Sequence, residues 1–321
     1  MKSEVLVSVC MTAYNQAKFI VEAIEGVLMQ QTDFPFELLI GEDFSMKDNT
    51  LDICLNYQKK YPEIIRIVHD KKNHGMVANE QRLMDLAEGK YIAFCEADDY
   101  WIHPLKLQKQ VNILENNLQF AACASQSRVI YEVDKEHWHL LSDASLIDRQ
   151  VTLQDQLNGT GGFQTASFMF RTKYIHEVPP MPIVINGWDR AVFILNAYRG
   201  IIYWFNEPMT VYRKNESGIS TQVSFDKMAK DVEMIDWFMS IDKKFPINAL
   251  KAYIYESMIS NARTISNLQL IIYYLAAQYY ANKSPMDMSV LKISANKTLA
   301  YRLPKNIRRF FRIIGIVKNY E

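Results

Sequence analysis

The chain has 321 residues, of which 49% are hydrophobic and 22% charged, a balance typical of a globular protein with one large or two small domains. Its 36 basic and 36 acidic residues cancel to a formal net charge of zero, which argues against a nucleic-acid-binding protein. Four cysteines without CxxC spacing argue against a zinc site or a disulfide framework and favour a reducing compartment.

The N-terminus predicts a first strand and not a signal peptide, because Glu4 precedes an apolar run of only about six residues. The longest later apolar stretch, residues 268–281, is interrupted by two glutamines. It is shorter than the roughly 20 residues that a membrane-spanning helix needs. We therefore expect a cytoplasmic protein.

Strand and helix patterns alternate along the first 117 residues. Runs of β-forming residues predict strands at 5–12, 36–40, 64–68 and 91–95. Apolar residues at helical spacing and helix-stop signals predict helices at 18–30, 49–61 and 77–87. Such alternation with short connections implies an α/β fold, in which a parallel sheet has helices on both faces.

The predicted strand at 91–95 ends in three carboxylates, Glu96, Asp98 and Asp99. In an open α/β sheet, ligands bind outside the carboxyl ends of the strands, so these side chains would point toward the usual site. Hard oxygen ligands of this kind suit Mg²⁺ or Mn²⁺ bound together with a phosphate. The alternative is a solvated turn that caps the next helix, since Asp is a common turn and N-cap residue.

Two other predicted strands also end in polar residues. Thr12, Tyr14 and Asn15 end the first strand, and Asp43 follows the second. In a parallel sheet these residues lie beside Asp98 and offer a hydroxyl, an aromatic face and a carboxylate to a base and ribose, although Asn15 is also a common turn former. Neither GxGxxG nor GxxxxGK[ST] occurs, so we expect a metal and side chains to handle any phosphate.

The pattern weakens beyond residue 117. We predict strands at 121–132, 165–171, 201–205 and 209–212, a polar excursion at 134–149, and helices after residue 225. Asp189 lies in the first turn of a predicted helix that ends near residue 198. It could complement the helix dipole or act as a catalytic base presented at a helix start.

The C-terminal tail interleaves basic residues with phenylalanine and isoleucine, as in a basic amphipathic helix. The basic residues are Lys305, Arg308, Arg309 and Arg312. Such a helix can lie in an anionic membrane surface. A terminal helix docked on its own domain would have the same pattern, so both alternatives stay open.

Four segments together resemble the family 2 glycosyltransferases, inverting enzymes of GT-A fold. They are VSVCMTAYNQAKFIVEAIEGVLMQQ, FELLIGEDFSMKDNT, NHGMVANEQ and GKYIAFCEADDYWIHPLKLQKQV. Their order and spacing match over residues 5–115, and a looser match continues to residue 220. The chain is most similar to bacterial members that build capsular, lipopolysaccharide or other surface glycans.

The resemblance implies a Rossmann-like GT-A sheet, mostly parallel and flanked by helices, with a helical C-terminal region. It implies a glycosyltransferase domain at 1–220, with a nucleotide-sugar half at 1–117 and an acceptor half at 118–220. Residues 221–321 would form a helical extension.

The resemblance also implies how a nucleotide is bound. Thr12, Tyr14 and Asp43 fall where the family contacts the nucleoside, with Asn15 beside them. Asp43 takes the place of the carboxylate that reads the base. Asp98 falls on the family's DxD-type motif, toward the ribose and diphosphate.

Further roles follow for the metal, the base and the diphosphate. Asp99 falls on the ligand for Mg²⁺ or Mn²⁺, and we expect Asp98 and Glu96 to contribute to the same site. Asp189, in NGWDR, falls on the family's catalytic base, which favours that role over the helix dipole. YRKNESGIS, residues 212–220, resembles a stretch near the diphosphate and offers Arg213 and Asn215.

The chain departs from the family pattern at three places. Glu96 stands where many relatives have the first Asp of the motif, and Asn215 replaces a common His. Glu80 and Gln81 occupy the places of an Arg-Asn pair, which removes a cation near the diphosphate unless Arg82 substitutes for it.

The sequence therefore predicts a metal-dependent, inverting glycosyltransferase of hexosyltransferase type. It would use a UDP-, GDP- or dTDP-linked sugar and a glycan or lipid-linked acceptor in surface polysaccharide synthesis. A lipid-linked acceptor would suit peripheral contact of the tail with the inner face of the cell membrane.

Two alternatives remain. One is a degenerate, non-catalytic protein that binds a nucleotide or a partner enzyme, suggested by Glu80 and Asn215. The other is a nucleotidyltransferase, which usually needs a glycine-rich first loop bearing Arg or Lys, and residues 12–18 are not such a loop.

Overall fold

The computed structural model describes residues 4–142, 147–215, 223–262 and 265–304. The basic tail from residue 305 and the part of YRKNESGIS beyond Asn215 lie outside these ranges. The chain divides into two compact units. Met1–Thr152, Gly162–Pro180 and Val192–Glu216 form the first, and Leu153–Gly161, Met181–Ala191 and Ser217–Glu321 the second.

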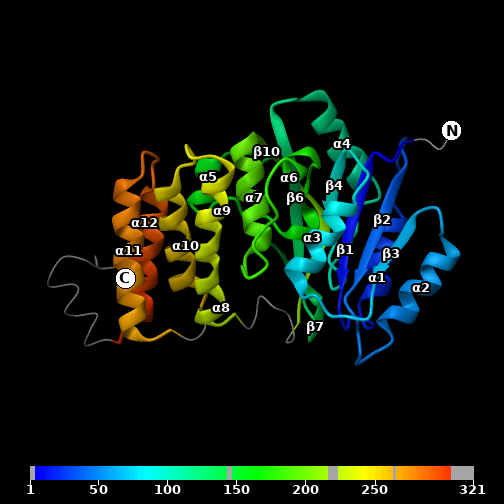
Figure 1. Cartoon of the computed structure of the whole chain (residues 1–321), viewed down its shortest axis with the longest axis horizontal. Helices are drawn as coiled ribbons and strands as arrows, with labels where there is room; N and C mark the ends of the chain where they lie inside the picture. The colour runs from blue at the N-terminus through cyan, green and yellow to red at the C-terminus, as the bar shows by residue number, and fades with distance from the viewer. Residues whose placement is uncertain (1–3, 143–146, 216–222, 263–264, 305–321) are drawn as a thin grey trace. The chain divides into compact units, whose positions relative to one another are not determined.

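The first unit contains a ten-stranded sheet whose central path has the order β3-β2-β1-β4-β9-β6-β10-β5 (Figure 1). Outside this path, β7 pairs with β6 and β8 pairs with β10. The strands are β1 (Val7–Ala13), β2 (Phe36–Glu42), β3 (Ile65–His69), β4 (Tyr91–Phe94), β5 (Tyr100–Trp101), β6 (Phe120–Tyr131), β7 (Asp134–Leu140), β8 (Arg149–Val151), β9 (Met169–Arg171) and β10 (Ile201–Lys214).

Most of the sheet is parallel, as predicted. Strands β3, β2, β1 and β4 form parallel pairs in turn, and β6 and β10 also pair in parallel. The short strands β5, β7, β8 and β9 pair antiparallel to their neighbours. The alternation predicted for the first 117 residues is confirmed, with element boundaries shifted by a few residues at most.

Helices follow the first strands, as the predicted α/β pattern requires. They are α1 (Ile20–Leu28), α2 (Thr50–Lys60), α3 (Met76–Leu86) and α4 (Lys106–Asn116), with the short helix α6 (Lys173–His176) later in the same unit. Because β1, β2 and β4 are covered on both faces, their side chains are almost all buried, which explains their continuous apolar runs.

A close contact between α1 and β5 fixes the chain directly after the acidic segment. A Cβ atom on Gly26 would lie 2.9 Å from both the backbone N and O of Trp101. Only glycine therefore permits this approach of helix and strand. The Trp101 side chain is buried beneath and donates from Nε1 to the carbonyl of Ala166 at 2.9 Å.

Three predictions for the second half of the sheet were wrong in detail. The strands expected at 201–205 and 209–212 are one strand, β10, because a register irregularity around Pro208 absorbs the residue that cannot donate to the ladder. The excursion expected at 134–149 contains β7, in which the described side chains from Asp134 to His139 are exposed, so no alternation of buried and exposed residues marked it as a strand. The strand expected at 165–171 begins with the 3-10 turn η1 (Thr165–Ser167).

The second unit is helical, as expected for the C-terminal region. Its helices include α5 (Leu153–Leu157), the first turn of α7 (Trp188–Arg199), α8 (Phe225–Ala229), the 3-10 turn η3 (Lys230–Val232), α9 (Glu233–Ile241), α10 (Ile247–Asn261), α11 (Asn267–Lys283) and α12 (Ser289–Arg302). Ile259 of α10, Tyr274 of α11 and Leu299 of α12 share one core. Within the described ranges, no helix has both the length and the apolarity to cross a lipid bilayer.

Candidate functional site

The carboxyl ends of β1, β2 and β4 meet at one edge of the sheet. Ala13 is the register partner of Glu42, and Cys10 is the partner of Phe94. Beyond the ladders, the backbone N of Asp43 donates to Ala13 O at 2.9 Å. The parallel pairing therefore brings the polar ends of the first two strands to the acidic segment that follows β4, as the sequence predicted.

Asp99 is buried and holds two distant segments at this edge. Its Oδ1 accepts the backbone N–H of Arg213 at 2.8 Å, and its Oδ2 accepts a hydrogen bond from the Gln164 amide. Burial, followed by the charge of Asp98, raises the pKa of Asp99 well above its usual value. No sequence pattern indicated Gln164, since it stands in a loop 65 residues away from Asp99.

Asp98 and Glu96 lie beside Asp99, but they have different partners. Asp98 Oδ2 accepts a hydrogen bond from the Asn215 side chain at 3.4 Å, while burial raises its pKa. Glu96 Oε2 is buried and has no hydrogen-bond partner within the described chain. Burial and the charges of Asp99 and Glu80 raise the pKa of Glu96 well above its usual value.

Glu80 adds a fourth carboxylate to this edge. It lies on α3, is almost fully buried, and its carboxylate accepts a hydrogen bond from the Thr12 hydroxyl. Burial raises the pKa of Glu80 to about 8. The sequence identified Glu80 only as a departure from the family pattern, whereas the structure places its charge close to Glu96.

Arg213 is the buried cation beside these carboxylates. One of its nitrogens pairs with Glu22, and its guanidinium stacks over Phe19 at 4.6 Å and Tyr100 at 5.0 Å. Its Nε and Nη1 atoms are buried, and neither has a hydrogen-bond partner in the described parts of the chain. Arg213 therefore has unused donors next to Asp98, on which its charge acts.

Asp43 organises the loop that leads into α3. Its Oδ1 accepts the backbone N–H of His74 at 2.7 Å, and its Oδ2 accepts that of Gly75 at 2.9 Å. The carboxylate is buried, and each oxygen keeps a lone pair for a further donor. Recognition of a base by Asp43 stays a prediction.

Tyr14 and Asn15 follow β1 at the same edge. The Tyr14 side chain is 46% exposed, so its ring is accessible to a ligand. Asn15 has a left-handed backbone conformation with φ 52°, and its N–H donates to Ser45 Oγ at 2.8 Å. Asn15 Oδ1 accepts the N–H of Lys47 at 3.1 Å, so this residue shapes the turn, whatever its role toward a nucleotide.

Asp189 lies in the second unit, in the first turn of α7. Its Oδ1 accepts the N–H of Arg190 at 2.8 Å. Burial raises the pKa of Asp189, and the positive charge of Arg190 acts in the opposite direction. A carboxylate with a raised pKa in a desolvated setting is suited to accept a proton.

An ion pair holds the loop before Asp189. Arg190 Nη2 lies 2.5 Å from Asp231 Oδ2, and Asp231 Oδ1 accepts the backbone N–H groups of Asn186 at 2.7 Å and Gly187 at 2.9 Å. A Cβ atom on Gly187 would lie 2.3 Å from Arg190 Nη2, so the side chain folds over the glycine. No pattern in the sequence indicated this role for Arg190 or Asp231.

The carboxylates of the first unit fit a hard divalent ion in charge and donor chemistry. Within the described ranges, no three His, Cys, Asp or Glu side chains are grouped so that they could hold a metal ion. However, Glu96 has a buried oxygen without a partner, and the mutual repulsion of Glu96 and Asp99 would be relieved by a cation. Mg²⁺ and Mn²⁺ often use one or two carboxylates plus substrate phosphates, and these residues fit that arrangement.

Comparison with known proteins identifies a matching family model and several related sequences. A family model described as "Glycosyl transferase family 2" matches residues 8–178. An uncharacterized Mycobacterium tuberculosis protein is 34% identical over 212 residues, which cover 66% of this chain and 60% of that protein. TuaG of Bacillus subtilis, whose name assigns it to teichuronic acid biosynthesis, is 34% identical over 109 residues, 34% of this chain and 42% of TuaG.

Two solved structures share the fold. Staphylococcus aureus TarS 1-349 in complex with UDP-GlcNAc has a TM-score of 0.58 and 18% identity, covering 93% of this chain and 92% of that one. Mannosyltransferase PcManGT from Pyrobaculum calidifontis, in complex with GDP-Man and Mn²⁺, has a TM-score of 0.56 and 14% identity, covering 98% and 85%. The predicted GT-A fold is confirmed.

Proposed function

Because the chain belongs to glycosyl transferase family 2, we propose that it transfers a sugar from a nucleotide-sugar donor to a glycan or lipid-linked acceptor. The observation that carries this proposal is the group of carboxylates at the carboxyl edge of the sheet, the buried Asp99 and the partly buried Glu96 and Asp98, with Arg213 beside them. This group offers binding atoms for a diphosphate and its counterion. We further propose that transfer inverts the anomeric carbon.

Asp189 is the proposed base. It takes the proton of an acceptor hydroxyl while that oxygen forms a bond to the anomeric carbon. The bond between that carbon and the donor phosphate oxygen breaks, and the nucleoside diphosphate leaves with the electron pair. The raised pKa of Asp189, caused by burial, makes it a better proton acceptor than an exposed aspartate.

The leaving diphosphate needs positive charge. The Nε and Nη1 donors of Arg213, which have no hydrogen-bond partner among the described residues, are suited to bind its oxygens. Asn215 is close enough to Asp98 to complete the same polar surface. Asp99, with Asp98 or Glu96 as a second carboxylate, would hold Mg²⁺ or Mn²⁺. Such an ion would supply positive charge for the leaving diphosphate.

The nucleoside would occupy the ends of the first two strands. In this proposal Tyr14 stacks on the base, Thr12 and Asn15 line the same edge, and Asp43 accepts a hydrogen bond from the base. The donor nucleotide would be UDP, GDP or dTDP. TarS with UDP-GlcNAc and PcManGT with GDP-Man support a nucleotide sugar as the ligand class.

The proposed setting is surface polysaccharide synthesis in the cytoplasm, in line with the name of TuaG. A lipid-linked acceptor would bring the basic tail to the inner face of the membrane. One observation favours a second candidate, a non-catalytic nucleotide-binding protein. Glu80 puts a further buried carboxylate where the family commonly has an arginine, and this weakens diphosphate binding unless a cation compensates.

A thermal-shift screen tests the proposal. UDP, GDP, dTDP, CMP and their common sugars are each added with and without Mn²⁺. Because a ligand that binds only the folded state stabilises it, one nucleotide together with the metal should raise Tm. Sugar release from that nucleotide sugar then separates an enzyme from a binder, and released pyrophosphate would indicate a nucleotidyltransferase. No shift with any of these ligands contradicts the proposal.

A further inference from the structure

Helix α11 is apolar on two opposite faces. Leu270, Tyr274, Ala277 and Ala281 are buried against the neighbouring helices. The opposite face exposes Leu268 at 68%, Ile272 at 50%, Leu275 at 49% and Tyr279 at 57%. These four residues are spaced four, three and four positions apart, so they form one continuous stripe along the helix.

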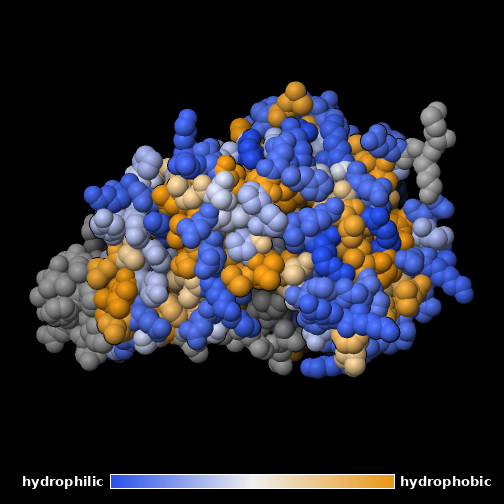
Figure 2. Space-filling model, viewed as in Figure 1, coloured by the Kyte–Doolittle hydropathy of each residue, from blue (hydrophilic) through white to orange (hydrophobic). Residues whose placement is uncertain are grey.

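Helix α12 also exposes apolar residues. Val290, Ile293 and Tyr301 are exposed at 47%, 47% and 86%, and Lys297 lies at the matching spacing between them. Figure 2 shows hydrophobic residues on the surface over α11, next to hydrophilic ones. We call the exposed residues of α11 and α12 the outer face. Single exposed apolar residues are ordinary, but a stripe of this length indicates a partner.

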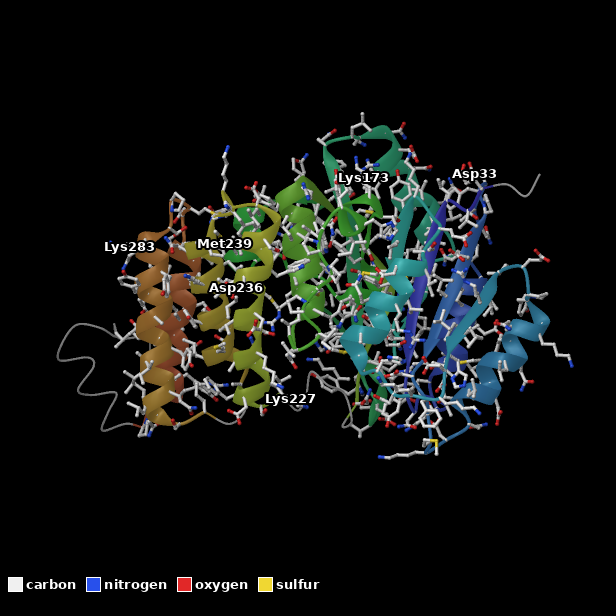
Figure 3. All side chains as sticks on the ribbon, in the orientation of Figure 1. Asp33, Lys173, Lys227, Asp236, Met239 and Lys283 are labelled. Atoms are coloured by element: carbon white, nitrogen blue, oxygen red, sulfur yellow. The ribbon has the colours of Figure 1, made fainter. Side chains whose placement is uncertain are left out.

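The net charge of the C-terminal region, residues 267–321, indicates the chemistry of the partner. Neither α11 nor α12 contains an acidic residue. Residues 267–321 carry nine basic and two acidic side chains, a net charge of +7, so residues 1–266 carry −7. Lys283 projects from the end of α11, and its ammonium lies 5.9 Å from the Tyr279 ring (Figure 3).

A second copy of the chain would be a poor occupant. In a symmetric dimer the same surface faces itself, so the basic residues of both copies would meet. An anionic lipid surface, in contrast, attracts the lysines, accepts the apolar stripe and accommodates Tyr279 and Tyr301 at the boundary with water. The basic tail has the same sign of charge and would add to this attraction.

We infer that the outer face of α11 and α12 docks on an anionic phospholipid surface, with α11 lying in the plane of the membrane. Its apolar stripe would enter the headgroup region, and Lys283 and Lys297 would contact lipid phosphates. This inference does not depend on the transferase assignment, because it rests on residues far along the chain from the carboxylates.

Vesicle co-sedimentation of the full chain tests the inference. We expect binding to vesicles of equal parts phosphatidylglycerol and phosphatidylcholine, weak binding to phosphatidylcholine alone, and loss of binding at about 1 M salt, where charges are screened. Ile272→Glu with Leu275→Glu should reduce binding at least about tenfold. Both positions are half-exposed, so Tm should be unchanged.

A matched control variant distinguishes loss of the outer face from a general effect of adding two negative charges. Leu118→Glu with Val133→Glu, at exposed positions of the first unit, should leave vesicle binding unchanged. Replacing Arg308, Arg309 and Arg312 with Gln measures how much the basic tail contributes to vesicle binding. Full binding by the Ile272→Glu, Leu275→Glu variant would overturn the inference, as would a dimer that this variant dissociates without loss of vesicle binding.

Discussion

At the scale of single residues, Asp189 is the sharpest test of the proposed reaction. Asp189→Asn keeps the size of the side chain but removes its ability to take a proton. We expect transfer to fall by about 10²- to 10⁴-fold, the usual contribution of a general base. Nucleotide binding, measured by titration calorimetry, should be unchanged. Transfer at the wild-type rate would place the base elsewhere.

Lys106 gives the clearest pH dependence. It is fully buried, donates to Gln110 Oε1 at 2.7 Å and lies 4.1 Å from the Trp101 ring centroid. Burial lowers its pKa to about 7. Between pH 7 and the unfolded value near 10.4, the unfolded state binds more protons, so this residue makes stability rise with pH.

The expected slope is at most about 1.4 kcal/mol per pH unit in that window. Urea unfolding at several pH values measures it against Lys106→Met, which removes the titrating group and keeps the apolar stem. Lys109→Met, on the same helix but paired with Glu207 at the surface, is the control. Equal pH profiles for wild type and Lys106→Met would contradict the assignment.

At the scale of elements, Asp231 joins the turn before α7 to the helices that follow residue 217. Asp231→Ala would leave the Arg190 charge without its ion-pair partner and two backbone N–H groups without acceptors. We expect a loss of about 3–5 kcal/mol of stability, measured by urea unfolding. Asp236→Asn, at an exposed aspartate on α9, should stay within about 0.5 kcal/mol of wild type (Figure 3).

Gly26 tests the contact between α1 and β5. Alanine normally stabilises a helix relative to glycine by about 1 kcal/mol. Here the added Cβ would meet backbone atoms of Trp101 at 2.9 Å, which cannot move without shifting β5. Gly26→Ala should therefore lower Tm and weaken binding of nucleotide with Mn²⁺, whereas Val21→Ala on the exposed side should do neither. A higher Tm for Gly26→Ala would refute this reading.

Whether a feature could be predicted from the sequence depends on how local that feature is. The strand at Tyr91 and its acidic end were predictable, because burial on both faces and the order of elements are written in consecutive residues. The Gln164 contact with Asp99 and the Asp231 contact with Arg190 were not, since their partners lie 65 and 41 residues apart. Strand β7 was not predicted because its described side chains from Asp134 to His139 are exposed, so its sequence lacks the alternation of apolar and polar residues that indicates a strand.

At the scale of the whole molecule, charge is distributed unevenly although the total is zero. Residues 1–266 carry a net charge of −7, which includes the four carboxylates at the proposed diphosphate site, where Arg213 is the neighbouring cation. An anionic nucleotide sugar therefore approaches against a negative field. A divalent cation between the carboxylates and the diphosphate would reverse the sign of that interaction.

Removal of metal should consequently weaken donor binding at least about tenfold, roughly 1.4 kcal/mol. Titration calorimetry with the nucleotide selected by thermal shift, in Mn²⁺ and then in EDTA, measures the change. The Asp99→Asn variant should bind the nucleotide with the same affinity with and without Mn²⁺, because the proposed main carboxylate ligand of the ion is lost. Unchanged affinity of the wild type in EDTA would mean that Arg213 alone offsets the diphosphate, and the metal would have to be removed from the mechanism.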